Sequence, residues 1–318
     1  MTREPHPCDG ICDSVLDTVG HTPLIRMQRV VPAGGPVQLL AKHEGYNPTG
    51  SVKARIIAAM LDDYERRGRL RPGMTLVEAS SGNTGIALAM AAAVKGYPCT
   101  ILMGKRLSRE RRQMVRAFGA ELILVDGGTD EAWAQADAMV QAKPDRYFRF
   151  HQYESEENWR AHYRTTGPEL WRQTGGRLDV LVATLGTTGT LLGAARYLKE
   201  QNPALRVVSV EPDSGRSRQQ GIRNLTHLRL PPFWDPAIAD ERRLCRDDDA
   251  FAHARRLALE EGIFAGISAG SALWAALDEV RRLARGTVVF IVPDGGEKYL
   301  TTELFAFRDD PVVNAPME

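Results

Sequence analysis

Residues 75–96, "TLVEASSGNTGIALAMAAAVKG", place a short β-branched segment, a turn of small polar residues and an alanine-rich segment in immediate succession. The alanine-rich segment ends at Gly96, and glycine is a common residue just after the last turn of a helix. The stretch therefore predicts a strand that leads through a glycine-containing turn into a buried helix. Repeated units of this kind build parallel sheets.

The same alternation continues along most of the chain. Further strands are expected at residues 37–44, 99–104, 121–127, 179–185, 206–212 and 287–296, and helical spacing recurs at residues 109–119, 156–176 and 191–203. The pattern predicts an α/β fold with mostly parallel, twisted sheets and helices on both faces. Ligands of such sheets bind beyond the carboxyl ends of the strands, so the polar turns after strands are the places to look for a site. Residues 211–238 show no periodicity and are too long for a routine connection, which predicts a functional loop.

The composition excludes several classes of function. With 318 residues, 43% hydrophobic and 25% charged residues and a formal net charge of +1, the chain resembles an ordinary globular protein. This charge balance gives no reason to expect a nucleic-acid or membrane partner. No apolar run approaches the roughly 18 residues of a membrane span, and the first residues lack a signal-peptide pattern, so we expect a cytoplasmic protein. The four cysteines form neither a disulfide framework nor a paired zinc motif, so no metal site is expected.

The turn at residues 185–190, "LGTTGT", has the composition of an anion site. Its two glycines allow close approach to the backbone, and its three threonines add hydroxyl donors at the start of a helix. It lacks the lysine of a P-loop and the glycine spacing of a dinucleotide turn, so a single phosphate on a small cofactor suits it best. The alternative is a strand-to-helix turn in which threonines only cap the helix.

Two other segments supply different chemistry. The turn at residues 80–85, "SSGNTG", exposes backbone N–H groups that could hold a carboxylate, and the Asn83 amide could bond a ring hydroxyl or a substrate oxygen. In residues 47–53, "NPTGSVK", Ser51 is the expected N-cap of a helix whose first turn contains Lys53. The helix dipole there lowers the pKa of a lysine, and a neutral amine can form a Schiff base with an aldehyde. A solvent-exposed lysine is the alternative for Lys53 taken alone.

Together these motifs resemble a known family. The segments "HTPLIRM", "NPTGSVKAR", "EASSGNTGIALAM", "TTGPELW", "LGTTGTLLG", "EGIFAGISAGSA" and "GEKYLTT" follow one another from His21 to about Phe305. In this order they resemble the cysteine synthase (O-acetylserine sulfhydrylase) family, most closely its B-type branch. The resemblance implies pyridoxal 5'-phosphate as cofactor and fold type II, the fold of the tryptophan synthase β-like enzymes. It also implies a homodimer with a small mobile domain at residues 45–148 and a large cofactor-binding domain made of residues 1–44 and 149–318.

The resemblance also implies roles for individual residues. Lys53 would hold the cofactor and move protons. The cofactor would further contact Asn83 at its ring hydroxyl, Ser268 at its pyridine nitrogen, and Gly186, Thr187, Thr188, Gly189 and Thr190 at its phosphate. The substrate carboxylate would bind to Ser80, Ser81, Gly82, Thr84 and Gln152, and Arg223 would bind an anionic part of a substrate. Asp294 is the alternative partner of the pyridine nitrogen; as a carboxylate it would make the cofactor a stronger electron sink than Ser268 would.

The activity implied by the resemblance is β-replacement on an O-activated serine, either O-acetylserine or O-phosphoserine. Sulfide would give L-cysteine and thiosulfate would give S-sulfocysteine, so the partners would be amino-acid and sulfur-donor substrates. A β-eliminating lyase, such as a serine or threonine dehydratase or a cysteine desulfhydrase, is the alternative with the same cofactor, as is a cystathionine β-synthase-like enzyme. A nucleotide-binding α/β protein without catalytic activity is the alternative from another class.

Overall fold

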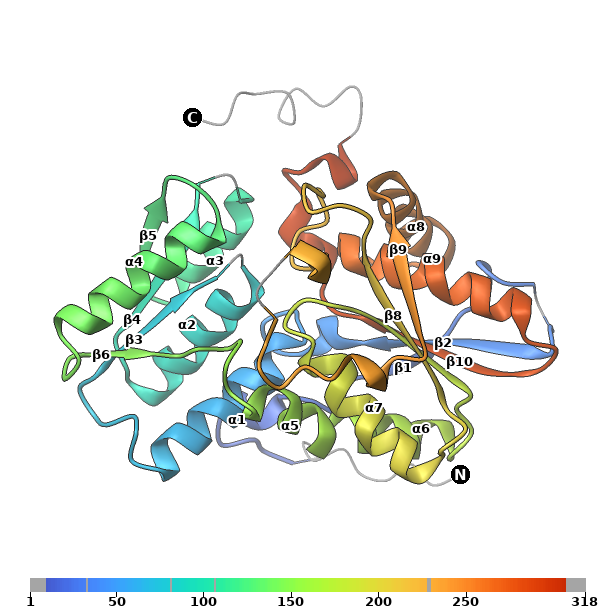
Figure 1. The fold of residues 1–318 in the computed structure, drawn as a ribbon, viewed down its shortest axis with the longest axis horizontal. Helices are drawn as coiled ribbons and strands as arrows, with labels where there is room; N and C mark the ends of the chain where they lie inside the picture. The colour runs from blue at the N-terminus through green and yellow to red at the C-terminus, as the bar shows by residue number, and fades with distance from the viewer. Residues whose placement is uncertain (1–9, 33, 81, 106, 228–229, 307–318) are drawn as a thin grey trace.

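The computed structural model describes residues 10–32, 34–80, 82–105, 107–227 and 230–306, and in these residues the chain forms two sheets (Figure 1). The larger sheet has the strand order β1-β2-β10-β7-β8-β9, and the smaller has the order β5-β4-β3-β6. Every pairing is parallel except that of β1 with β2. The strands are β1 (Leu24–Arg26), β2 (Val37–His43), β3 (Thr75–Ala79), β4 (Cys99–Gly104), β5 (Glu121–Val125), β6 (Tyr147–Arg149), β7 (Val180–Thr184), β8 (Arg206–Pro212), β9 (Glu241–Cys245) and β10 (Gly286–Val292).

Helices connect most of these strands. The α-helices are α1 (Lys53–Arg66), α2 (Asn83–Lys95), α3 (Arg109–Ala117), α4 (Thr129–Ala142), α5 (Glu157–Arg164), α6 (Thr166–Thr174), α7 (Gly189–Gln201), α8 (Asp247–Glu261) and α9 (Ile267–Arg282). Short 3-10 helices are η1 (Val15–Thr18), η2 (Glu44–Tyr46), η3 (Leu225–His227), η4 (Pro236–Ile238), η5 (Gly296–Tyr299) and η6 (Glu303–Phe305). In the described part of the chain, no helix combines the length and apolar character needed to cross a bilayer.

Each sheet is buried on both faces. Along β7, Val180 packs into the cluster that contains residues of α8 and α9, whereas its neighbour Leu181 packs against α6 and α7. Along β3, Leu76 packs among α1, α2 and α3, whereas Val77 packs against α4. Burial on both faces explains why these strands are continuous apolar runs rather than alternating ones. The predicted α/β fold with helices on both faces is therefore confirmed.

Three strands, the end of a fourth and one helix boundary differ from the sequence prediction. The strand expected at residues 287–296 ends at Val292, and a 3-10 helix begins at Gly296. The strands β1 and β6 have only three residues each, and β9 is an edge strand with the charged sequence "ERRLC", so none carries a clear strand pattern. Residues 156–176, expected to be helical throughout, form the separate helices α5 and α6, which meet at Thr165 with a non-helical backbone (φ −125°, ψ −68°).

The strand orders place both polar turns where connections diverge. In the smaller sheet, β4 and β5 extend to one side of β3 while β6 lies on its other side. In the larger sheet, β8 and β9 extend to one side of β7 while β10 lies on its other side. Such reversals open a crevice at the carboxyl ends of the central strands. The turns at residues 80–85 and 185–190 follow β3 and β7, so each sheet presents one polar turn at its own reversal point.

A buried group of charges fixes α1 against the larger sheet. Arg55 donates from Nε to Glu44 Oε2 (2.6 Å) and from Nη1 to Glu169 Oε1 (2.7 Å), and Lys42 Nζ donates to Glu169 Oε2 (2.6 Å). All four residues are at most 4% exposed. The adjacent positive charges hold the pKa of both glutamates below its usual range despite their burial. The group therefore joins β2, η2, α1 and α6 through two ionised glutamates and the Arg55 guanidinium.

We expect Arg55→Met to lower the free energy of unfolding by roughly 3–5 kcal/mol, because two buried carboxylates would lose their shared partner. The matched control is Arg66→Met on the same helix, where an exposed guanidinium pairs with Asp63. The control should change the free energy of unfolding by less than about 1 kcal/mol. Urea unfolding followed by circular dichroism measures both values. Equal losses in the two variants would show that the buried charge group does not stabilise the fold.

Candidate active site

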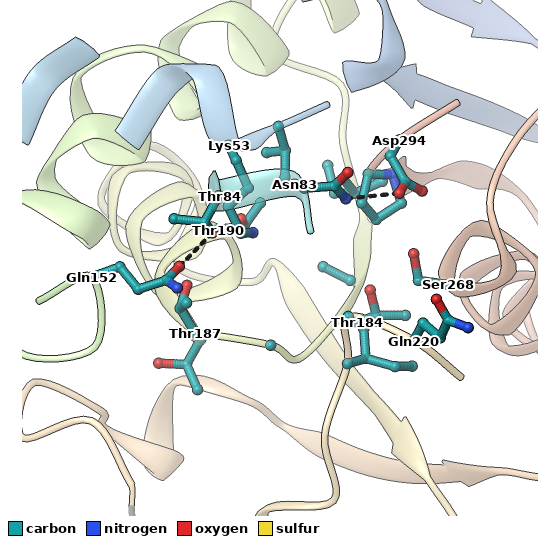
Figure 2. A pocket seen from close by; sticks show the side chains of 18 of the residues that line it. Lys53, Asn83, Thr84, Gln152, Thr184, Thr187, Thr190, Gln220, Ser268 and Asp294 are labelled. Atoms are coloured by element: carbon teal, nitrogen blue, oxygen red, sulfur yellow. Dashed lines mark hydrogen bonds between the residues drawn. The ribbon is translucent and has the colours of Figure 1, made fainter. Parts of the chain in front are cut away.

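A cavity opens where the carboxyl ends of the two sheets meet (Figure 2). Its wall includes the start of α1, the turn after β3, the segment after β6, the turn after β7, the loop after β8, the start of α9 and the end of β10. The loop after β8 contributes Gln220, Gly221 and Ile222, which agrees with the functional loop expected in residues 211–238. Of the residues expected to form the site, Lys53, Asn83, Thr84, Gln152, Gly186, Thr187, Thr188, Thr190 and Ser268 line this cavity.

Lys53 is the first residue of α1, and its position is set by backbone contacts with the end of β10. The Val52 N–H donates to the Pro293 carbonyl (2.8 Å), and Ser51 forms a β-bridge with Asp294. The expectation that Ser51 caps the helix is wrong: the N-cap is Val52, and the buried Ser51 Oγ has no partner in the described part of the chain. The bridge holds Ser51 before the helix begins, so its hydroxyl does not act as the cap.

The environment of Lys53 favours the neutral amine. Burial lowers the pKa of Lys53 to about 8, although the negative charges of Asp294 and Glu44 act in the opposite direction. The expected lowering is confirmed, but its largest cause is removal from water rather than the helix dipole. At neutral to mildly alkaline pH, a substantial fraction of the molecules therefore carries Lys53 as a neutral amine, which can act as a nucleophile and a base.

Asn83 and Asp294 meet beside Lys53. Asn83 Nδ2 donates to Asp294 Oδ2 (2.7 Å), and the Tyr299 hydroxyl donates to the same oxygen (2.8 Å). Asn83 Oδ1 and Asp294 Oδ1 are buried and have no partner among the described residues. Buried acceptors of this kind are costly unless a ligand supplies donors.

The turn after β3 is joined to the segment after β6. Ser80 Oγ accepts hydrogen bonds from the N–H groups of Gly82 (3.1 Å) and Gly85 (3.0 Å), and Thr84 Oγ1 donates to Gln152 Oε1 (2.6 Å). Figure 2 shows Thr84 and Gln152 together on one side of the cavity. The structure thus brings Thr84 and Gln152, both expected to hold a carboxylate, together on the cavity wall, whereas Ser80 and Gly82 lie in the same turn but do not line the cavity. Ser81, expected with them, lies outside the described residues.

Glycine is required twice in the turn after β7. A Cβ on Gly189 would collide with the Asn158 side chain, and one on Gly186 would lie 2.7 Å from the Gly221 carbonyl oxygen. Thr188 has a left-handed backbone (φ 67°), and its buried Oγ1 has no partner in the described ranges. This is a narrow turn with an unused hydroxyl donor at the start of α7, as the anion site predicted from the sequence requires.

Two residues of α5 support this turn and were not expected from the sequence. Asn158 Oδ1 accepts from Thr187 Oγ1 (3.3 Å), and His162 Nε2 lies 3.2 Å from Thr190 Oγ1. Burial, assisted by the positive charge of Arg55, lowers the pKa of His162 to about 3, so the imidazole is neutral. In the sequence, only their spacing indicates that they act together, because polar residues four positions apart share one helix face.

Of the last two expected residues, Ser268 lines the cavity and Arg223 does not. Ser268, the second residue of α9, is 4% exposed and lines the cavity. Arg223 lies outside the wall, where its guanidinium stacks on the rings of Tyr153 (4.7 Å) and Trp133 (5.1 Å). Because Tyr153 itself lines the cavity, Arg223 is one side chain away from it.

The unused polar atoms of the cavity fit pyridoxal 5'-phosphate. Thr188 Oγ1 and the N–H groups at the start of α7 suit a phosphate, Asn83 Oδ1 can accept from a ring hydroxyl, and the Lys53 amine suits an aldehyde. These three functions lie on the wall of one cavity. The residues present therefore fit this cofactor.

Comparisons with known proteins agree with this fit. The family model described as "Pyridoxal-phosphate dependent enzyme" matches residues 15–294. Cysteine synthase B of Pseudomonas aeruginosa is 45% identical over 92% of this chain and 97% of its own, and cysteine synthase A of Escherichia coli is 41% identical over 91% and 94%. The crystal structure of cysteine synthase (OASS) from Entamoeba histolytica superposes with a TM-score of 0.87 at 33% identity and covers 100% of both chains. The chain therefore belongs to the family of pyridoxal-phosphate dependent enzymes, within its cysteine synthase group, and has the fold type II architecture of that group.

Proposed function

We propose that this protein forms L-cysteine by β-replacement, in which a sulfur nucleophile takes the place of the acetoxy group of O-acetylserine and acetate leaves. The observation that carries the proposal is the partly neutral Lys53 amine on the wall of a cavity that also presents a carboxylate turn and a phosphate turn. Relatives named cysteine synthase, more than 40% identical over about nine-tenths of the chain, support it. Pyridoxal 5'-phosphate, bound at Lys53, supplies the electron sink that makes the α-proton of the amino acid acidic.

The residues expected at the site from the sequence have distinct roles in this proposal. Lys53, once its amine is free, accepts the α-proton of the substrate and later returns a proton to the same carbon. Thr84 and Gln152 orient the substrate carboxylate together with Ser80, Ser81 and Gly82. Gly186, Thr187, Thr188, Gly189 and Thr190 would hold the cofactor phosphate, and Asn83 would bond its ring hydroxyl.

We assign the pyridine nitrogen to Ser268 rather than to Asp294. One oxygen of Asp294 already accepts from Asn83 and Tyr299, which ties this carboxylate to the Asn83 side of the cavity. A neutral hydroxyl does not force protonation of the ring nitrogen, so negative charge on the substrate α-carbon is stabilised less. This favours loss of a β-substituent together with the α-proton over transamination.

The two-sheet architecture suits a closing motion. We propose that residues 45–148 form a small domain that moves over the substrate, and that residues 1–44 and 149–318 form the large domain. Thr84 comes from the first and Gln152 from the second, so their contact would tighten as the cleft closes and excludes water. A cytoplasmic homodimer, with amino-acid and sulfur-donor substrates as its small-molecule partners, completes the proposal and rests on the family resemblance.

The proposed reaction predicts that purified holoenzyme converts O-acetylserine and sulfide to cysteine. Lys53→Ala should lower kcat by about 100- to 10,000-fold or more, because it removes the base. Lys143→Ala, which changes an exposed lysine, should leave the rate unchanged. Chromatographic assay of cysteine and pyruvate distinguishes the alternatives. Pyruvate as the main product in the presence of sulfide would identify a β-eliminating lyase instead.

The lowered pKa of Lys53 predicts how cofactor capture depends on pH. Because only the neutral amine reacts with an aldehyde, the rate at which apoenzyme takes up pyridoxal 5'-phosphate should rise with pH through a midpoint near 8. Asp294→Asn should move this midpoint downward, since the Asp294 charge raises the pKa of Lys53. Stopped-flow absorbance near about 410 nm measures the rate. A midpoint near the ordinary lysine value of about 10.4 would contradict the burial of this amine.

A further inference from the structure

Arg111 is a buried cation on the cavity wall that the proposed reaction does not use. It belongs to α3, is 1% exposed, and lines the cavity together with Lys53 and Thr84. Its Nη1 donates to Gln220 Oε1 and lies 3.4 Å from Ser108 Oγ, and its guanidinium carbon lies 4.5 Å from the centre of the Tyr299 ring. Its Nε is buried and has no partner in the described part of the chain.

Among the described residues, the other buried arginines are neutralised by carboxylates, whereas Arg111 is not. Arg55 pairs with Glu44 and Glu169, Arg149 with Glu78 and Asp137, and Arg243 with Glu241, Asp278 and Glu279. Within the described ranges Arg111 contacts an amide, a hydroxyl and an aromatic ring, and no carboxylate. A buried cation without a counter-charge is strongly unfavourable. The site is therefore electrostatically incomplete without an anion.

The nearby carboxylate of Asp294 does not supply this counter-charge. Tyr299 lies between the two groups, donating its hydroxyl to Asp294 and presenting its ring face to Arg111. No ion pair joins Arg111 to Asp294 among the described residues, and the second oxygen of Asp294 has no partner there. None of the described residues that contact Arg111 carries a negative charge.

We propose that Arg111, positioned by Gln220, binds a tetrahedral oxyanion carried by a substrate. This inference rests on the proposed function, in which Thr84 and Gln152 already serve the substrate carboxylate, so that Arg111 serves a second anion. Nε and a terminal nitrogen of guanidinium form a planar fork that bonds two oxygens of one oxyanion. Either the phosphate of O-phosphoserine or the sulfonate end of thiosulfate has this chemistry. Gln220 comes from the loop after β8 and Arg111 from α3, so an arriving anion would be held between the two sides of the cleft.

The first test is calorimetric binding of thiosulfate, inorganic phosphate and acetate to the holoenzyme. Arg111→Gln should weaken binding of the two tetrahedral anions by roughly ten- to a hundredfold, the effect of losing charge-assisted hydrogen bonds, and should affect acetate less. The control Arg116→Gln removes one exposed charge from the same helix and should leave all three affinities unchanged. Equal weakening in both variants would reduce the effect to net charge and overturn the proposal.

A second variant keeps the test decisive if Arg111→Gln does not fold. Gln220→Glu places a carboxylate against the guanidinium in the position where the amide oxygen now accepts. This internal anion should replace the external one, so thiosulfate and phosphate should bind roughly ten- to a hundredfold more weakly than to the wild type. Unchanged or tighter binding in Gln220→Glu would overturn the proposal.

Kinetics then identify the source of the oxyanion and separate the two proposals. In Gln220→Glu, a raised KM for O-phosphoserine with sulfide assigns the site to a leaving group, and a raised KM for thiosulfate with O-acetylserine assigns it to the sulfur donor. A KM that rises in neither pair overturns the substrate role of Arg111. Absence of cysteine from O-acetylserine and sulfide in the wild type would refute the proposed function itself, while calorimetry still reports whether Arg111 binds an oxyanion.

Discussion

The placement of Lys53 depends on the buried ion group around Arg55. Arg55 follows Lys53 by two residues on the first turn of α1, and its guanidinium is held by Glu44 beside β2 and by Glu169 on α6. These bonds therefore fix the rotation of the first turn of α1 about the helix axis relative to the larger sheet. The backbone contacts of Ser51 and Val52 with the end of β10 fix the same turn from the other side. Buried charge and backbone pairing together hold one amine at the junction of two sheets, where burial lowers its pKa.

The cavity follows from the strand order of both sheets. Each sheet reverses its order once, at β3 and β6 in the smaller and at β7 and β10 in the larger. At each reversal, the loops that follow the two central strands run in opposite directions and leave a crevice between them. The crevices of the two sheets contribute to the same cavity. The turn after β3 and the turn after β7 can thus act on one ligand although about 100 residues lie between them. The turn after β7 leads into α7, whose first N–H groups have no helical partner and can bind an anion.

Local patterns explain what the sequence revealed and what it did not. The strands with apolar runs, the turn after β7 and the lysine after "NPTGSV" were predictable, because turn residues and periodicity act over a few positions. Asn158 and His162 support that turn from a helix 28 or more residues away, which no local pattern reports. The sequence around Ser51 is typical of an N-cap, but the backbone of Ser51 pairs with Asp294, more than 200 residues later, which no local pattern reports. Arg111 lies in a helix with four arginines, and only the fold distinguishes the one that is buried.

The charged side chains of the cavity, Lys53, Asp294 and Arg111, occupy different positions on its wall. This arrangement suits a lysine that must act as both nucleophile and base. Asp294 lies near Lys53 and raises the pKa of its amine, so a fraction of the lysine stays protonated near neutral pH despite burial. The Arg111 guanidinium lies over the Tyr299 ring, and the Tyr299 hydroxyl donates to Asp294. Among the described residues no ion pair joins Arg111 to this carboxylate. A guanidinium beside Lys53 would lower the pKa of this lysine further and would compete with the lysine for the Asp294 carboxylate. An anion that binds at Arg111 would pair with the guanidinium, and Asp294 would keep its effect on the pKa of Lys53.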